Sequence, residues 1–224
     1  VVGAVSLSLA VRSESQRHAV LQLLQWGMVW LENAVNNETA ERSAASVAAL
    51  EAVSLVSRDL PLAVVCHALC NFLAERLDCS QVALGTWAGL QVHVLSISHQ
   101  LQFDRRVSQI GQLEFAMEEC LDQGDRIVLP AGSGQDKLPT QAHEQLLRVD
   151  GNGSVCTLPL KAGGESVGAL LLIRDRTNGF DEITVDMIAG IADCVGPLIQ
   201  LKQREARSGW GRSAQTMSAW LGRL

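Results

Sequence analysis

The apolar positions follow a helical period in the first third of the chain and again in its last part, with short strand-like runs and helical segments between them. In the first third, apolar residues recur every three or four positions, which is the period of a helix with one buried face. This pattern predicts helices over residues 13–36, 40–56 and 60–77. Ser13 and Gln16 form a capping-box sequence at the start of the first helix, and Leu60-Pro61 opens the third.

In the middle of the chain the helical period gives way to short β-like runs bounded by turn residues. Strands are predicted over residues 80–87, 90–98, 126–129, 155–160 and 166–173, with helices over 109–121 and 140–149. Ala88-Gly89 and Gly163-Gly164 are short enough to close two hairpins. Strict alternation along the second strand places His93, Leu95 and Ile97 on one face. The pattern therefore predicts five strands, mostly paired as antiparallel neighbours.

A last helix is predicted to begin at Phe180-Asp181-Glu182. Asp181 is suited to cap its first turn, and Phe180 can pack on Val185 as a hydrophobic staple. The apolar stripe of this helix consists of Ile188, Ile191, Val195 and Leu198. Pro197 interrupts that stripe and is predicted to kink the helix or to end its first section.

Two motifs carry a family resemblance. Residues 154–160 read S-x-x-x-x-P-L, residues 167–172 read V-G-x-L-x-L, and Phe180 precedes the long helix. This order resembles a GAF domain over residues 57–203. The resemblance implies an α+β fold (an α/β sandwich) with a mostly antiparallel sheet of five to six strands. It places the N- and C-terminal helices on one face, and short helices, loops and a small-molecule pocket on the other.

Two extensions flank the GAF-like region, and they differ in charge from its body. Residues 1–56 are predicted to form a helical extension of two helices, and residues 204–224 a basic amphipathic tail. From residue 198 onward the chain has five basic residues against Glu205 alone, whereas the rest has 13 basic and 23 acidic residues. An acidic body repels phosphates, so we expect no nucleic-acid partner.

Few residues offer chemistry to a pocket in the predicted sheet. His93 is a titratable residue well inside a strand, and Cys156 and Thr157 lie on a strand that is predicted to be its neighbour. With Trp87, at the end of the first strand, these are the candidate ligand-binding residues. For His93 itself, a partly buried histidine hydrogen-bonded to backbone is favoured over a ligand contact. No catalytic residue and no metal site is predicted.

The six cysteines are predicted to be reduced and mostly buried, because they fall in apolar helical and strand patterns. One group has the residue types of a metal site, namely Cys66, His67, Cys70 and Cys79. It lacks a C-x-x-C pair, and Cys66 and Cys70 share their helix face with leucines. A role in the core is therefore favoured over metal binding.

The family resemblance leaves the ligand open. Bilin-binding members attach the pigment through a cysteine followed by histidine, which the middle loops lack, and residues 178–182 keep only fragments of the cyclic-nucleotide signature. Histidine is a common axial ligand of haem, and His93 and His143 are candidates for that role. We therefore predict a non-catalytic sensing or interaction domain of regulatory role, dimerising through its terminal helices, and leave the cofactor unknown.

An enzyme is the alternative from another class. GAF-type reductases of free methionine sulfoxide need a reactive thiolate and a resolving cysteine at the pocket mouth. The middle loops, residues 103–106 and 131–137, contain no cysteine, and Cys120 and Cys156 fall within regular elements. The sequence therefore favours the sensing domain.

A second, looser resemblance concerns the ends of the chain. The segments QWGMVWLE and VGPLIQLKQR are similar to cytosolic GAF regions of HlyD-type membrane-fusion adaptors in bacterial efflux and secretion. The tail carries an amphipathic stripe of Trp210, Ala214, Met217, Leu221 and Leu224, the composition of an interfacial helix. The absence of a basic leader and of an apolar run of about 18 residues predicts a cytoplasmic segment. The resemblance implies a location at the inner membrane, with a span just past Leu224.

Overall fold

The computed structural model describes residues 43–100, 108–130, 139–150, 153–175 and 179–221, so the predicted helix over residues 13–36 lies outside them. Its centre is a five-stranded sheet of order β2-β1-β5-β4-β3 in which all neighbours are antiparallel. The strands are β1 (Gln81–Ala88), β2 (Gln91–Ile97), β3 (Ile127–Leu129), β4 (Ser154–Ala162) and β5 (Glu165–Arg174). The predicted α+β architecture is confirmed.

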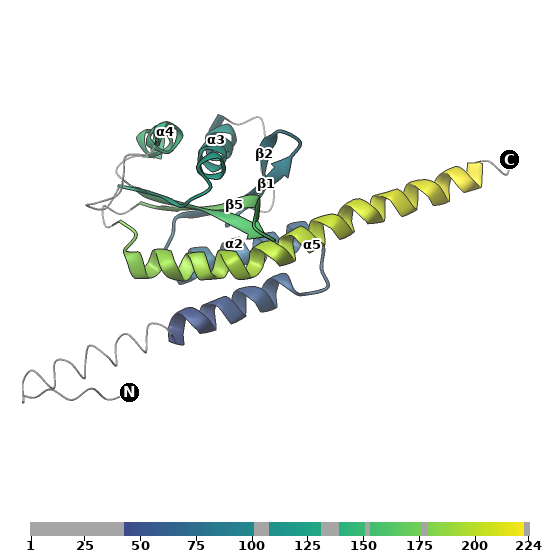
Figure 1. The fold of residues 1–224 in the computed structure, drawn as a ribbon, viewed down its shortest axis with the longest axis horizontal. Helices are drawn as coiled ribbons and strands as arrows, with labels where there is room; N and C mark the ends of the chain where they lie inside the picture. The colour runs from purple at the N-terminus through teal and green to yellow at the C-terminus, as the bar shows by residue number, and fades with distance from the viewer. Residues whose placement is uncertain (1–42, 101–107, 131–138, 151–152, 176–178, 222–224) are drawn as a thin grey trace, which may run out of the picture. The chain divides into compact units, whose positions relative to one another are not determined.

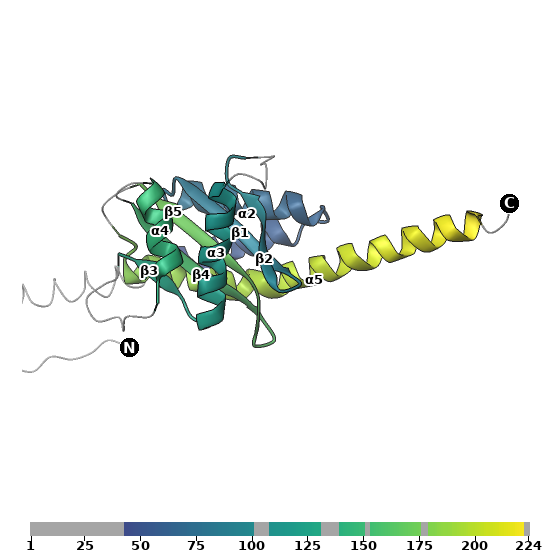
Figure 2. The same ribbon diagram turned by 90° about the horizontal axis from the view of Figure 1, so that it is seen from above.

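Helices cover both faces of the sheet (Figure 1). On one face lie α2 (Leu62–Arg76) and the first half of α5 (Glu182–Leu221). On the other lie α3 (Ser108–Gln123) and α4 (Gln141–Asp150). Figure 2 shows α3 and α4 in front of the strands when the sheet is seen from above. The sheet therefore has two separate cores, one on each face.

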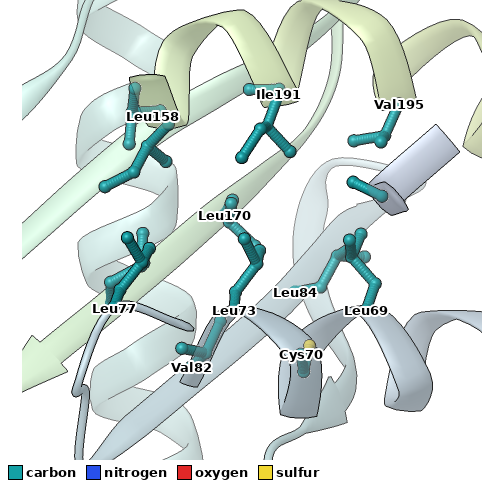
Figure 3. Packing of buried hydrophobic residues seen from close by; sticks show 14 of the residues in the cluster. Leu69, Cys70, Leu73, Leu77, Val82, Leu84, Leu158, Leu170, Ile191 and Val195 are labelled. Atoms are coloured by element: carbon teal, nitrogen blue, oxygen red, sulfur yellow. The ribbon is translucent and has the colours of Figure 1, made fainter. Parts of the chain in front are cut away.

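Side chains alternate between these two cores along β4. Cys156, Leu158 and Leu160 belong to the core beneath α2 and α5, and Val155 to the core beneath α3. In Figure 3, Leu73 of α2 and Ile191 of α5 meet Leu170 of β5 in the first core. Burying each such side chain stabilises the fold by roughly 1.5–3 kcal/mol.

The alternation fails in β2, where the pairing with β1 shifts register between Leu84 and Gly85. The sequence predicts Leu95 and Ile97 on one face, but Leu95 packs against the α2/α5 core and Ile97 lies in the α3 core. A β-bulge adds one residue to a strand and reverses the faces beyond it. The predicted face of β2 is therefore wrong past the bulge.

The two family-like motifs have physical reasons in the sheet. A Cβ at Gly168 would lie 2.3 Å from the Gly85 carbonyl oxygen of the neighbouring strand, so only glycine fits there. The pairing of β3 with β4 extends to Thr157 and not to Pro159. Proline has no N–H, and it is tolerated where a strand lacks a second neighbour. Both motifs therefore follow from strand packing.

A helix over residues 43–56 adds to the core on the α2/α5 side. Ala48, Ala52 and Val56 recur every four residues and are fully buried. Residues Ala45–Leu224 form one compact unit, to which this helix belongs. The predicted domain limits at residues 57 and 203 stay predictions, and the core that they enclose draws side chains from before residue 57.

The start of α5 follows the predicted capping pattern. The Thr184 N–H donates to the Asp181 Oδ1 atom at 2.7 Å, and Phe180 and Val185 are both buried in the same core. The Arg174 guanidinium lies over the Phe180 ring, 4.2 Å from its centre. Hydrogen bonds from the Thr184 side chain and from the Thr184 N–H lower the pKa of Asp181, because they favour the ionised carboxylate.

Pro197 does not end α5, which continues to Leu221. Of the two predicted alternatives at Pro197, the end of the first section is wrong, and a kink stays a prediction. Val195 and Ile199 are buried on either side of the proline, so packing on the sheet holds the helix through the missing hydrogen bond. Gly196 allows this packing, since its backbone lies directly against that of Lys161 in β4.

Candidate functional site

The four predicted site residues lie in different places. Cys156 is buried beneath α2 and α5, whereas Thr157 is buried on the opposite face of β4. His93 lies on the edge strand β2, with its Nδ1 atom 3.4 Å from the Glu114 Oε1 atom of α3. Trp87 is half-buried at the far end of β1 and lines a surface cleft. The structure therefore does not bring the four side chains together in one pocket.

A buried polar network lies on the α3/α4 face of the sheet. Glu119 of α3, His143 of α4 and Thr157 of β4 follow one another in hydrogen-bonding distance. The Glu119 Oε2 atom lies 2.6 Å from His143 Nδ1, and the Thr157 hydroxyl lies 2.8 Å from His143 Nε2. The carboxylate can only accept, so Nδ1 donates to it and the hydroxyl donates to Nε2. In this tautomer both ring nitrogens of neutral His143 have a hydrogen-bond partner.

The Glu119 carboxylate also anchors the first turn of α4. Its Oε1 atom accepts the Ala142 N–H, and its Oε2 atom accepts the His143 N–H, both at 3.2 Å. These amides have no partner within the helix, and the helix dipole favours a negative charge there. Glu119 therefore links α3 to α4 and fixes the imidazole of His143 at the same time.

A carboxylate, an imidazole and a hydroxyl in series are also the parts of a nucleophilic relay. Here His143 and Thr157 have no exposed surface. Burial lowers the pKa of His143 below its ordinary value, and the Glu119 carboxylate offsets only part of this effect. A hydroxyl that is closed off from solvent cannot reach a substrate. The network therefore holds the sheet and the two helices together.

Sequence reasoning missed this network, although one signal for it exists. His143 and Leu146 are three residues apart on α4, and both are buried. A histidine on the apolar face of an otherwise polar helix indicates a buried polar contact. Its partners, Glu119 and Thr157, lie 24 and 14 residues away in the sequence, and only the fold brings them together.

Two further glutamates of α3 cover the free edge of the sheet. The Glu118 Oε1 atom accepts the Val92 N–H at 2.8 Å, and the Glu114 Oε1 atom accepts the Val94 N–H at 3.0 Å. Glu114 and Glu118 are four residues apart and share a helix face, while the outward N–H groups of β2 alternate. Exposed edge amides invite pairing with other chains. α3 therefore protects the edge strand β2.

A surface cleft of about 260 Å³ lies between the sheet and α5. The sheet contributes the end of β1 and the start of β5, and α5 contributes four polar side chains. The lining residues are Trp87, Ser166, Val167, Gln200, Gln203, Arg204 and Arg207. This cleft combines an indole ring, amide and hydroxyl groups and two cations.

The cysteines are buried in the cores, with Cys194 of α5 as the exception. Burial raises the pKa of Cys66 and Cys120 to about 12 and that of Cys79 to about 11. Burial also raises the pKa values of Cys70 and Cys156. A thiol with a raised pKa is a poor nucleophile at neutral pH. Within the described residues, no group of three His, Cys, Asp or Glu side chains is placed to hold a metal ion.

This burial predicts how many thiols react in the native protein. With dithiobis(nitrobenzoate) at pH 8, we expect one thiol to react quickly and all six to react in denaturant. The released thionitrobenzoate measures the count by absorbance. Cys194→Ser should remove the fast reaction. A second thiol that reacts as fast as Cys194 in the folded protein would contradict the burial of the other five.

No helix in the described ranges has the length and apolar character that crossing a membrane requires.

Comparison with known proteins identifies the family. The GAF domain family model matches residues 61–197, which is more than half of the chain. No curated protein matches the chain in sequence.

Several solved structures share the fold at low sequence identity. A GAF domain from A. aeolicus in an inactive state has a TM-score of 0.53 at 14% identity, over 72% of this chain and 99% of that one. The phycocyanobilin-bound GAF domain of a cyanobacterial phytochrome has a TM-score of 0.53 at 13% identity, over 72% and 96%. Free methionine-R-sulfoxide reductase from Neisseria meningitidis in complex with its substrate has a TM-score of 0.51 at 12% identity, over 72% of this chain and 93% of that one. The chain belongs to the GAF domain family.

Proposed function

We propose that this GAF domain is a non-catalytic regulatory module that transmits a binding event through α5. One observation carries the proposal. α5 is packed on the sheet by Ile188, Ile191, Val195 and Ile199, and it continues to Leu221. Residues 204–207, beyond this packing, are exposed. A single helix therefore reaches from the core of the domain into an exposed segment, as an output element requires.

The proposal includes a homodimer formed through the terminal helices. Val47 and Leu50, three residues apart on the helix over residues 43–56, are 46% and 70% exposed. Leu201 of α5 is 54% exposed. Apolar side chains that recur on one helix face are stabilised when a second helix covers them. A second copy of the chain offers the same surfaces, and a symmetric dimer is the commonest assembly.

Light scattering after size-exclusion chromatography tests the dimer. We expect a mass about twice the 24.1 kDa of the chain. Leu50→Glu combined with Leu201→Glu should weaken the dimer at least tenfold, because two charges would have to be buried without partners. Leu90→Glu is the matched control, since Leu90 is 96% exposed in the β1–β2 turn. A wild-type chain that stays monomeric at high concentration, or a control that dissociates equally, contradicts the proposed interface.

The non-catalytic character is supported by the state of the reactive groups. The hydroxyl and imidazole of the Glu119 network are closed off, and each has its hydrogen-bond partners within the fold. The buried cysteines have raised pKa values, the largest cause being burial. A methionine sulfoxide reductase needs an accessible thiolate and a second cysteine within reach. The one exposed cysteine, Cys194, lies on α5, and the proposal therefore favours a sensor over a reductase.

We place this module, as part of the proposal, on the cytoplasmic side of a HlyD-type secretion or efflux adaptor. The support is the sequence resemblance of the two terminal segments and the basic character of the chain after residue 198. Basic residues that flank a membrane span are retained on the cytoplasmic side. Arg204 and Arg207 are exposed and are available to an anionic surface or ligand.

A further inference from the structure

We propose that the cleft between Trp87 and α5 binds a small organic anion that carries a planar apolar ring. This goes beyond the proposed module, because it assigns a ligand class and a place for it. The cleft lies where the sheet meets α5. Trp87 contributes an aromatic ring, Ser166 a hydroxyl group and Arg204 a cation.

The cations supply the first part of the argument. Arg204 and Arg207 are three residues apart on α5, so their guanidinium groups share one face of the helix. Within the described residues, neither is joined to a carboxylate by an ion pair. A guanidinium group binds a carboxylate or phosphate through two parallel hydrogen bonds. The pair therefore favours an anion at the α5 side of the cleft.

The opposite wall determines the rest of the ligand. Trp87 packs in part against the core beneath α3, Val167 packs in part against the core beneath α2 and α5, and both contribute surface to the cleft. Indole faces stack well on planar rings. Ser166 and Gln203 add groups that accept or donate hydrogen bonds. A volume of about 260 Å³ suits a single-ring molecule better than a dinucleotide. The lining therefore selects a small molecule with an apolar ring at one end and an anionic group at the other.

The position of the cleft on α5 gives binding a consequence. Ile199 is the last buried residue of α5 among those whose burial is described. Gln200, Gln203, Arg204 and Arg207 all follow it. A ligand held by these side chains and by Trp87 would link the exposed part of α5 to the sheet. Binding would therefore restrict that part of the helix.

Three probes separate the contributions of charge and ring. Benzoate has both, acetate has only the charge, and benzyl alcohol has only the ring. The readout is the indole N–H resonance of Trp87 in a ¹⁵N correlation spectrum, identified with Trp87→Phe, at constant ionic strength. We expect benzoate to shift this resonance saturably, with acetate and benzyl alcohol each needing at least about tenfold higher concentrations.

The test variant combines Arg204→Gln with Arg207→Gln in one protein. Arg76→Gln is the control variant. Arg76 is an exposed arginine of α2 outside the cleft, and such exposed substitutions leave folding almost unchanged. The double variant should weaken benzoate binding about tenfold or more and leave benzyl alcohol unaffected. Equal binding of benzoate and benzyl alcohol, or undiminished binding by the double variant, would overturn the assignment.

Hydrogen exchange tests the consequence for α5. Saturating benzoate should slow amide exchange over residues 200–207 at least severalfold, and acetate at the same concentration should not. Unchanged exchange with benzoate bound would show that the cleft does not act on the helix. Light scattering tests the dimer and the Trp87 resonance tests the anion site, so failure of the proposed dimer and failure of the anion site are distinguishable.

Discussion

Gly196→Ala is expected to destabilise the domain by about 3 kcal/mol. A Cβ at this position would lie 2.4 Å from the carbonyl oxygen and 2.9 Å from the nitrogen of Lys161 in β4. Both atoms belong to the backbone of a paired strand, so neither can turn aside as a flexible side chain does. α5 must therefore move away from the sheet and lose part of the packing of Val195 and Ile199. Urea unfolding followed by circular dichroism measures the change.

Gly190→Ala in the same helix is the matched control. Gly190 is exposed, and its added Cβ meets no atom within 4 Å. Alanine is a better helix former than glycine by up to ~1 kcal/mol, so this variant should be slightly more stable than the wild type. The same substitution thus has opposite signs six residues apart. Equal effects at the two positions would show that α5 does not approach β4 as closely as the structure has it.

The residue pattern was sufficient to predict the strands from sequence. The five predicted strands agree with β1 to β5 to within a few residues at each end, because each is a short, largely apolar run bounded by polar, glycine or proline residues. It was insufficient in β2, where the bulge opposite Leu84 and Gly85 reverses the faces. A bulge depends on how two strands fit each other, and a single strand's pattern does not contain that information.

The candidate site was harder to predict for a similar reason. Cys156 and Thr157 are neighbours in one strand, so alternation sends them to opposite faces. The cleft at Trp87 is completed by Arg204 and Arg207, more than a hundred residues further along the chain. The sequence showed these arginines only as part of a basic tail. Which charge meets which ring is decided by the path of α5 across the sheet.

The second large effect is expected from the buried network. Glu119→Gln should lower the free energy of unfolding by about 2–3 kcal/mol. The carboxylate accepts three donors, namely the His143 Nδ1–H and the N–H groups of Ala142 and His143. A glutamine side chain of the same shape has one acceptor oxygen, and its NH₂ group faces donors. At least one buried donor then loses its partner, and α4 loses the negative charge at its first turn.

Glu118→Gln, at the preceding residue of α3, is the matched control. The Glu118 Oε1 atom accepts one hydrogen bond, from the Val92 N–H. An amide oxygen can replace it, so we expect a loss below about 1 kcal/mol. A similar loss in both variants would indicate that the carboxylates act through the general charge of α3. A loss confined to Glu119→Gln would locate the effect in the contacts with α4.

The pH dependence of stability distinguishes the two variants further. The folded-state pKa of His143 lies below its ordinary value of 6.5, chiefly because of burial. The unfolded chain therefore takes up a proton as pH falls through 6.5, while the folded chain does not. This histidine's contribution to stability is complete above pH 6.5 and is lost below it, by up to ~1.4 kcal/mol per pH unit.

Glu119 favours the protonated imidazole, so its replacement lowers the folded-state pKa of His143 further. Urea unfolding between pH 7 and pH 5 should show a loss for Glu119→Gln that is at least as steep as that of Glu118→Gln and continues to lower pH. A shallower loss in Glu119→Gln would show that His143 is charged in the folded protein.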